Sequence, residues 1–516
     1  MAWSHWGIFF LALVAVWIFL NAMDDLFIVL AFLLGKRNSF RWPKNSELAH
    51  CPQRRIAIFV PLWHEHEVIE SMLRHNLAAI LYGNYDIFVG VYPNDLLTIE
   101  AVERVLRDDG RVHLALCPHN GPTSKGDCLN WVHKAMVEYE HRHGIDFEIL
   151  MTHDAEDLIH PESLRLINWY SRDYQMVQIP VLPLATGIGE WTHGVYCDEF
   201  AEFQFKDIPL RQRLGGFLPS NGVGAGFERT AIESLRRRHL GRIFDPASLT
   251  EDYENGFRMF EAGFQQIFIP LRMQSGRPVA TREYFPRHRR AAVRQRSRWV
   301  AGIALQGWER HGWRVPARQW YWFWRDRKGL IGNLISPVAN VLFFCWLGNW
   351  AIGLGHASFD LLASLPAWLT GLCRASMAAS FLQVCVRIHL SARVYGYRFA
   401  AAAPLRVFWG NAINCAATVQ AFDQFLRARL RRHSLAWRKT EHVYPRVAPQ
   451  STNRPRLGEI LVGLRFVSAN DLEDALARKA KGQRVGEYLI ETGKITADHL
   501  DEALESQAVY AAASGD

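Results

Sequence analysis

The stretch FEILMTHDAED, residues 147–157, sets a short apolar run directly against three carboxylates. A run of this length that ends in polar residues is typical of a strand buried in a parallel sheet. Four more segments have the same texture and alternate with helical stretches, at residues 54–63, 85–95, 111–117 and 174–184. The alternation predicts a mostly parallel α/β sheet with helices on both faces, whose ligands bind beyond the carboxyl ends of the strands.

Apolar residues also gather on either side of this α/β region. The segments 6–34, 329–354 and 359–390 are long enough to span a membrane, so we predict a membrane protein with a large soluble insert. Asp24 and Asp25 interrupt the first segment, either as part of a polar pathway or at a helix end near the interface. A fourth stretch, residues 405–426, carries scattered polar groups and is predicted to be an amphipathic interfacial helix.

The basic residues predict the topology. They follow the first apolar segment at positions 36–44 and none forms a basic region before it, which favours an uncleaved anchor with an outward amino terminus. Three spans then place both the insert and the tail in the cytoplasm. The formal charge of +8 fits arginines that contact membrane lipid, and no motif supports a nucleic-acid partner. The eight cysteines form no CxxC pair and are predicted to be reduced.

Three segments combine residue types suited to polar chemistry. The acids at 154–157 are too crowded to be favourable without a cation, which favours a divalent metal over the alternative of a solvated loop. The segment TED, residues 250–252, begins a helical run in which Thr250 is a plausible N-cap. Gln295, Arg298 and Trp299 share one helical face, where arginine can pair with a diphosphate and tryptophan can stack on a sugar. A basic amphipathic helix lying on the membrane would explain the same face.

The order of these motifs along residues 54–310 resembles the membrane-embedded, family-2 inverting glycosyltransferases, the group of cellulose and hyaluronan synthases. VPLWHEHEVI at 60–69 resembles the P-x-x-N-E strand end of this family, with His64 in place of the usual asparagine. SKGDCLN at 124–130 resembles its Lys-Gly/Ala-x-x-Leu-Asn segment, and HDAED at 153–157 its DxD region. The resemblance implies an α/β GT-A (Rossmann-like) catalytic domain inserted between transmembrane helices.

The resemblance also implies roles for individual residues. The catalytic motif would be Thr250, Glu251 and Asp252, with Asp252 as the base. The ligands of Mg²⁺ or Mn²⁺ would be Asp154, Glu156 and Asp157. The residues expected to bind the UDP-sugar are Glu65, Asp95, Lys125, Asp154, Gln295, Arg298 and Trp299, with Lys439 and Thr440 of a gating segment, WRKTEH. A solvated charged loop would explain that last segment equally well.

The implied reaction moves a sugar from a UDP-sugar, with inversion, onto a glycan acceptor. The acceptor would grow into an exopolysaccharide, which an outer-membrane export partner would receive. The resemblance favours an N-acetylhexosamine donor and a bacterial inner-membrane location. Two alternatives stay open, namely non-processive transfer to a lipid carrier and a phage- or secretion-associated scaffold whose site is vestigial.

The tail repeats one motif, as RLGEILVGLRFVSANDLEDALARK from residue 456 and RVGEYLIETGKITADHLDEALESQ from residue 484. A small helical repeat explains the leucines. It does not explain Arg-x-Gly-Glu at the start of both copies, where we expect a backbone bend at glycine beside an exposed arginine. Such an arginine suits a phosphate or a guanine edge, and leucines suit the faces of a base.

The doubled motif is similar to the cyclic di-GMP-binding module at the amino terminus of MshE-type secretion and pilus ATPases. With this tail the chain resembles the phage-adsorption B group of inner-membrane glycosyltransferases, and cyclic di-GMP would be an allosteric activator. The alternative is a tail that docks a protein partner without nucleotide. The expected binding residues are Arg456, Leu457, Gly458, Leu461, Lys479, Arg484, Val485, Gly486, Leu489 and Gln507.

We therefore expect a chain of five parts. They are an anchor at 1–45, the catalytic domain at 46–315, transmembrane and interfacial helices at 316–445, a linker at 446–455 and a small, mainly helical module at 456–516.

Overall fold

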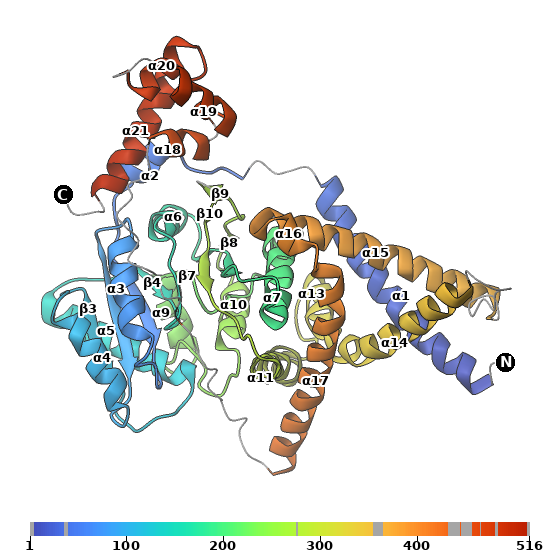
Figure 1. Ribbon diagram of the computed structural model, residues 1–516. Helices are drawn as coiled ribbons and strands as arrows, with labels where there is room; N and C mark the ends of the chain where they lie inside the picture. Colours follow the sequence, from blue (N-terminus) through green and yellow to red (C-terminus); the bar gives the residue numbers. More distant parts are fainter. Residues whose placement is uncertain are drawn as a thin grey trace.

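The computed structural model describes residues 5–35, 40–274, 277–353, 365–431, 444, 457–464, 466–479 and 483–512. An α/β domain lies between a group of long helices and a small helical unit (Figure 1). This arrangement confirms the expected fold class, a GT-A-like α/β core with membrane-type helices and a helical carboxyl-terminal region.

The α/β domain is built on a seven-stranded sheet with the order β3-β2-β1-β4-β7-β5-β8. Strand β7 is antiparallel to both of its neighbours, and the other neighbours pair in parallel. The strands are β1 Ile56–Pro61, β2 Tyr85–Val91, β3 Val112–Leu116, β4 Ile149–Thr152, β5 Met176–Gln178, β7 Ala225–Glu228 and β8 Gln266–Phe268. Two small sheets pair β6 Val181–Pro183 with β11 Thr281–Glu283, and β9 Met273–Gln274 with β10 Arg277–Pro278.

Alternation along β1 shows why this sheet is buried on both faces. Ile56 and Ile58 belong to one hydrophobic core, whereas Ala57 and Phe59 belong to the core on the opposite face. The first core is completed by α3 Ile69–Ala79, α4 Leu96–Leu106 and α6 Ser163–Tyr170. The second is completed by α5 Lys125–His143 and α9 Arg229–Arg238. The carboxyl ends of β1, β2 and β4 are left open at one edge.

A layer of shorter helices joins this domain to the long helices. Two of its members, η1 and η2, are π-helices that continue α7 and α11 without a break. The layer comprises α7 Trp191–Glu202, η1 Phe203–Asp207, α8 Ile208–Arg213, α10 Glu251–Glu261, α11 Arg289–Trp299, η2 Val300–Gln306 and α12 Gly307–His311.

Among the described residues, three helices are long and apolar enough to cross a membrane, by length and composition, at the positions of the three predicted segments. They are α1 His5–Leu34, the continuous helical stretch Ala317–Ile352, and α15 Ala367–Tyr395. The second stretch comprises α13 Ala317–Arg327 and most of α14 Gly329–Gly353. Helix α1 packs against both α14 and α15, and the three project together from the α/β domain (Figure 1).

The two carboxylates inside the first apolar segment lie where α1 meets α13. Lys328 Nζ is 2.6 Å from Asp24 Oδ2 and 2.9 Å from Asp25 Oδ1, and Tyr321 donates a hydrogen bond to Asp24. Arg325 pairs with both carboxylates. The acids therefore have a structural use, because they join the first long helix to the start of the second.

Helix α17, Ala403–Leu430, follows the short α16, Tyr397–Ala400, and is not one of the three spanning helices. It packs against α7, α11 and η2 of the connecting layer and against α14. In Figure 1 it runs across the inner ends of α14 and α15, and its place at the membrane interface stays a prediction.

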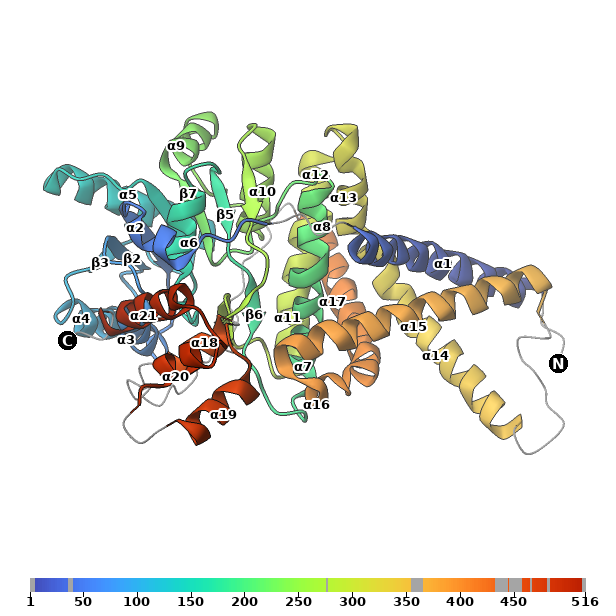
Figure 2. The ribbon, with the colours of Figure 1, turned by 90° about the horizontal axis from the view of Figure 1, so that it is seen from above.

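The tail folds as four helices, α18 Leu457–Gly463, α19 Ala469–Arg478, α20 Val485–Glu491 and α21 Ala497–Ala512. Each copy of the repeated motif supplies one short and one longer helix, and both copies share a single hydrophobic core. Helix α21 contacts α2, Asn45–His50, at the entry to the α/β domain (Figure 1). Figure 2 shows the tail on the same side of the sheet as α3 and α4.

Candidate active site

A pocket of about 70 Å³, here called the edge pocket, opens at the carboxyl ends of β1, β2 and β4. It collects several residues that the sequence marks as functional, although they are far apart along the chain. Its lining includes Glu65, Lys125, Asp154 and Arg298. The topology of a parallel sheet brings these side chains together, because the carboxyl ends of its strands share one edge.

The end of β1 is held by the residues that follow β2. His64 has a φ of +54° and its backbone N–H donates to Asp95 Oδ2 at 2.6 Å. Asparagine and histidine are both enriched in this left-handed region, so the departure from the family asparagine keeps the backbone shape. The Glu65 backbone N–H donates to Thr98 Oγ1 at 3.0 Å. Asp95 thus positions the strand end, with a side chain that is almost fully buried.

Two aromatic residues of the edge pocket, Trp63 and Tyr92, were missed in the sequence. Their rings meet edge to face at 5.4 Å, and the Tyr92 hydroxyl lies 2.6 Å from Thr123 Oγ1. A Cβ on Gly121 would stand 2.6 Å from the Trp63 ring, so this glycine permits the loop to lie against both rings. The sequence signal for these two residues was their position directly after β1 and β2. Residues there border the edge of a parallel sheet at which ligands bind.

Lys125, at the first turn of α5, connects two acidic motifs. Its Nζ is 2.6 Å from Asp154 Oδ1 and 3.9 Å from Glu251 Oε1. Burial alone would lower the pKa of Lys125, but Asp154 and Glu251 outweigh it and raise that pKa. Asn130, one turn further along α5, accepts hydrogen bonds from the backbone of Ile243 and Phe244 and so holds the segment that leads to residues 250–252.

The three acids of the DxD region do not converge on one point. Asp154 lines the edge pocket, whereas Asp157 is fully buried and accepts hydrogen bonds from His153 Nδ1 at 2.7 Å and from the Asp154 backbone at 2.9 Å. Glu156 is also buried, at 4% exposure. Among the residues that the structure describes, no group of three or more His, Cys, Asp or Glu side chains is arranged to hold a metal.

A fourth carboxylate near this loop, Glu283 on β11, gave no sequence signal. Burial raises its pKa well above the ordinary value, and the charges of Asp157 and Asp154 raise it further. The pairing of β11 with β6 and the bridge between Leu158 and Arg282 bring it there.

The predicted catalytic motif, residues 250–252, lies at the start of α10 within the connecting layer. Burial, with a contribution from Asp252, raises the pKa of Glu251 to about 7. Burial likewise raises the pKa of Asp252, although Lys125 and Arg298 act in the opposite direction. Thr250 occupies the N-cap position of α10, as predicted, but its side chain makes no capping hydrogen bond. Its side chain instead packs against Gly302 of η2, where a Cβ would stand 2.5 Å from Thr250 Oγ1.

The glycine-rich segment 218–226 approaches the same carboxylate. A Cβ on Gly222 would stand 2.7 Å from Asp252 Oδ2, and the residue has a φ of +80°. Gly256 of α10 faces the backbone of Leu218 and Ser220. A Cβ on this glycine would stand 2.5 Å from the Leu218 carbonyl oxygen. These two glycines let the segment lie against the start of α10.

Helix α11 delivers its last two residues to different spaces. Arg298 lines the edge pocket, and Trp299 lines a much larger cavity together with Asp252. The π-helix η2 starts at the next residue, Val300. Gln295 Oε1 is buried, and no hydrogen-bond partner for it lies within the described part of the chain. Gln295, Arg298 and Trp299 form the QxxRW motif. The helical face that they share therefore borders both the edge pocket and the larger cavity.

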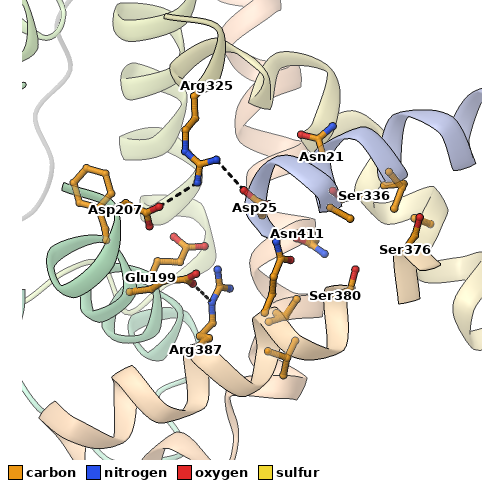
Figure 3. A pocket seen from close by; sticks show the side chains of 18 of the residues that line it. Asn21, Asp25, Glu199, Asp207, Arg325, Ser336, Ser376, Ser380, Arg387 and Asn411 are labelled. Carbon is orange, nitrogen blue, oxygen red and sulfur yellow. Dashed lines mark hydrogen bonds and ion pairs between the residues drawn. The ribbon is translucent and has the colours of Figure 1, made fainter. Parts of the chain in front are cut away.

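This membrane cavity, as we call it, has a volume of about 1240 Å³ and extends from Asp252 and Trp299 to α1, α14, α15 and α17. Its wall mixes aromatic rings with amides and hydroxyls (Figure 3). The polar residues from the long helices and α17 are Asn21, Ser336, Asn340, Ser376, Ser380, Gln383 and Asn411. The aromatic residues are Phe200, Phe203, Tyr253, Trp299, Phe343, Trp346, Phe381 and Phe408.

In the tail, the expected bend at each glycine is wrong, because Gly458 and Gly486 lie inside α18 and α20. A Cβ on Gly458 would stand 2.8 Å from Leu472, and one on Gly486 would stand 2.6 Å from Leu500. The glycines recur because each lets a short helix approach the longer helix of its own repeat. Glu487 recurs for a local reason too, since it accepts a hydrogen bond from the backbone N–H of Arg484 at the start of α20.

The other expected tail residues divide into core and surface. Leu461 and Leu489 are fully buried, and Leu457 and Val485 pack against the same core. Arg484 is exposed, and Lys479 Nζ donates to the Gln483 carbonyl at 3.1 Å. Leu476 and Leu504, which hold the same place in the two repeats, are exposed by 53% and 42% and were missed in the sequence. Lys439, Thr440, Arg456 and the side chain of Gln507 lie outside the described residues.

Comparisons with known proteins agree with the motif order. A family model described as glycosyltransferase like family 2 matches residues 52–302. Bacteriophage adsorption protein B of Escherichia coli strain K12 is 35% identical over 96% of this chain and 70% of its own length. Bacteriophage N4 adsorption protein B of Escherichia coli O157:H7 matches to the same extent.

Two solved structures are similar to this chain at low identity. Mannosyltransferase PcManGT from Pyrobaculum calidifontis, solved with GDP-Man and Mn²⁺, covers 80% of this chain and 99% of its own at a TM-score of 0.48 and 16% identity. TarS 1–349 of S. aureus covers 72% of this chain and 91% of its own at a TM-score of 0.32 and 11% identity. Likeness this low carries no information on donor or metal. The family model and the extent of identity to adsorption protein B are sufficient, and the chain belongs to the family-2 glycosyltransferases.

Proposed function

We propose that this glycosyltransferase moves a sugar from a UDP-sugar, with inversion, onto a growing glycan. The observation that carries the proposal is that Asp252 lines the membrane cavity within electrostatic reach of two cations of the edge pocket. Lys125 and Arg298 act on its charge from the edge pocket, while Asp252 itself lines the membrane cavity. A donor in the edge pocket and an acceptor in the membrane cavity would meet at this carboxylate.

In the proposed reaction, Asp252 takes the proton from an acceptor hydroxyl as its oxygen attacks the anomeric carbon. The bond from that carbon to the diphosphate breaks on the opposite face, which inverts the anomer and leaves UDP. The raised pKa of Asp252 makes it a stronger base than an ordinary aspartate. The cationic side chains of Lys125 and Arg298 are placed to stabilise the charge that develops on the leaving diphosphate.

Asp154 is the residue that would hold Mg²⁺ or Mn²⁺ beside the diphosphate. Its side chain lines the edge pocket and keeps 29% exposure, whereas Asp157 is turned into the core by His153. A divalent ion, when bound, would neutralise phosphate charge. A donor would also draw Lys125 from Asp154 toward its phosphates, which leaves this carboxylate available to the ion.

The charge of the membrane cavity favours a neutral glycan over a lipid phosphate as acceptor. The four cations that line it are all paired with carboxylates, so the described wall offers a phosphate no uncompensated cation. Aromatic rings with amides and hydroxyls instead suit a polyhydroxylated chain. The pairs are Lys206 with Glu202, Arg211 with Asp326, Arg325 with Asp207 and Arg387 with Glu202.

We further propose that cyclic di-GMP binds the tail and activates the enzyme. A ligand with two equivalent halves suits a module that presents Leu476 and Leu504 at equivalent places of its two repeats. Exposed Arg484 supplies a guanidinium for phosphate or guanine. The proposal includes an inner-membrane location with the tail in the cytoplasm. It includes the five parts of the chain, with boundaries at residues 45, 315, 445 and 455. It also includes an N-acetylhexosamine donor and export of the product through an outer-membrane partner.

The test is UDP release by the detergent-purified full-length protein with a panel of UDP-sugars, Mg²⁺ or Mn²⁺, and cyclic di-GMP present or absent. We expect turnover of one UDP-sugar that rises with the dinucleotide. Asp252→Asn should abolish turnover, and Arg484→Ala should leave basal turnover while removing the response. No turnover of any UDP-sugar would contradict the enzyme proposal, whereas turnover indifferent to cyclic di-GMP would contradict only the regulatory part.

A further inference from the structure

Arg296, inside the QxxRW motif but outside its named positions, is a buried cation with partners on two other helices. Its exposure is 6%. Its Nη2 is 2.8 Å from Glu199 Oε2 on α7, and its Nη1 donates to Asn414 Oδ1 on α17 at 2.6 Å. The guanidinium also lies 4.3 Å from the centroid of the Tyr196 ring. One side chain of α11 therefore binds both α7 and the interfacial helix.

A buried arginine charge is tolerated where a carboxylate compensates it, as Glu199 does here, although Nε and Nη2 make no hydrogen bond within the described residues. The planar guanidinium fixes the directions of its N–H groups, so two partners and a ring below it define one position of the side chain. Because α11 is a regular helix, fixing Arg296 also fixes the residues that follow it. Arg298 and Trp299 lie two and three residues further along, and they line the edge pocket and the membrane cavity respectively.

The polar residues of α17 form hydrogen bonds to two neighbouring helices. Asn411 Nδ2 donates to Asn340 Oδ1 at 3.3 Å, and Thr418 Oγ1 accepts from Asn333 Nδ2 at 2.9 Å, both on α14. Asn414 lies between these positions and binds α11 instead. Helix α17 thus links a membrane-spanning helix to the helix that carries the QxxRW motif.

We infer that Arg296 and Asn414 are positioning residues, which hold α11 on the interfacial helix so that Arg298 and Trp299 are set for transfer. The inference rests on the proposed function, because it assigns the two positioned side chains to donor and acceptor. The residues that would bind the nucleotide part of the donor, such as Glu65, Asp95 and Lys125, belong to other elements. Loss of the link should therefore lower kcat far more than it changes the donor KM.

The test compares Asn414→Leu with Asn414→Asp in detergent-purified full-length protein. Leucine is close in size but cannot accept from Arg296, whereas aspartate keeps the acceptor and adds a charge of opposite sign. We expect Asn414→Leu to lower kcat about 10- to 100-fold, the scale of a small misplacement, with the donor KM changed less than about threefold. Asn414→Asp should keep most of the kcat.

Two further variants test whether the contact between Arg296 and Asn414 is responsible for the change in kcat. Arg296→Lys keeps the charge but reaches fewer partners, and its effect on kcat should not add to that of Asn414→Leu in the double variant. Asp423→Asn is the control, since within the described part of the chain this residue of α17 forms an exposed pair with Arg427. It should leave kcat unchanged.

Calorimetric affinity for UDP and the thermal unfolding midpoint separate positioning from loss of fold. Unchanged kcat in Asn414→Leu would overturn the inference. A parallel fall of kcat, UDP affinity and midpoint, with no rescue by aspartate, would also overturn it, because the pair would then be structural only. Absence of turnover in the unmodified protein would contradict the proposed function instead.

Discussion

Asp252 is a half-buried carboxylate near two cations and two further acids, and its ionisation should control turnover. Lys125 and Arg298 favour the charged form, whereas burial and the charge of Asp154 disfavour it, and burial dominates. Glu251, its neighbour in sequence, also has a raised pKa. We therefore expect kcat to fall on the acid side with an apparent pKa above the ordinary value of about 3.9 for aspartate. A pH profile of kcat at saturating UDP-sugar measures it, and a profile flat down to pH 4.5 would contradict the assignment.

The same burial predicts a stability effect of opposite sign to the activity effect. A folded-state pKa above the unfolded value means that ionised Asp252 destabilises the fold above the unfolded pKa, and that protonation relieves the strain. Asp252→Asn should therefore lose turnover while its thermal midpoint at pH 7 stays equal or rises. A lowered midpoint would show that the carboxylate contributes to folding, and the loss of activity could no longer be assigned to the base.

Gly222 offers a matched test of the approach to Asp252. Alanine there must adopt a φ of +80° and would place its Cβ 2.7 Å from Asp252 Oδ2. Gly215 has a φ of +72°, but a Cβ on it meets nothing within 4 Å. Both Gly→Ala variants should lose about 1–2 kcal/mol of stability from backbone strain, and only Gly222→Ala should lose most of its kcat. Equal kcat in the two variants would show that the contact with Asp252 has no catalytic importance.

At the scale of elements, the strands were predictable because each is a short run of apolar residues, and these runs alternate with helical stretches. The run 54–63 predicted β1, and the carboxylates after residue 152 predicted the ligand edge, since both signals are local. The partners of those residues were not predictable. Glu283 reaches the loop after β4 only through the pairing of β11 with β6, a contact between segments that share no local pattern. Arg296 likewise needed the position of α17 to show its use.

The tail glycines belong to a repeat that could be located from the sequence, but the bend predicted at each of them was wrong. A recurring glycine suggested a bend, but two helices in van der Waals contact need a missing side chain just as strongly. Gly486→Val should push Leu500 away and speed amide hydrogen exchange across α20 and α21, with a loss of roughly 2 kcal/mol as in other overpacked cores. Ala477→Val, on the exposed face of α19, should change exchange little. Similar protection in both variants would contradict this packing account.

At the scale of the whole molecule, the α/β domain and the long helices are joined by buried ion pairs. Asp198 of α7 is the central case, because Arg406 of α17 binds it through Nε at 2.6 Å and through Nη2 at 2.9 Å. Ser391 of α15 donates to the same carboxylate. The two charged side chains are exposed by only 2% and 1%. These contacts fix α7 of the connecting layer against both α15 and α17.

Removing one partner of such a pair leaves a buried charge without compensation. Asp198→Asn should therefore lower the free energy of unfolding by about 3–5 kcal/mol, which thermal unfolding in detergent or urea denaturation can measure. Asp423→Asn, whose exposed pair with Arg427 lies on the same helix α17, should cost less than about 0.5 kcal/mol. Because Asp198 lies outside both the edge pocket and the membrane cavity, the remaining folded Asp198→Asn protein should keep its donor KM. A small stability loss with a changed KM would mean that the junction shapes the site instead of holding the domains together.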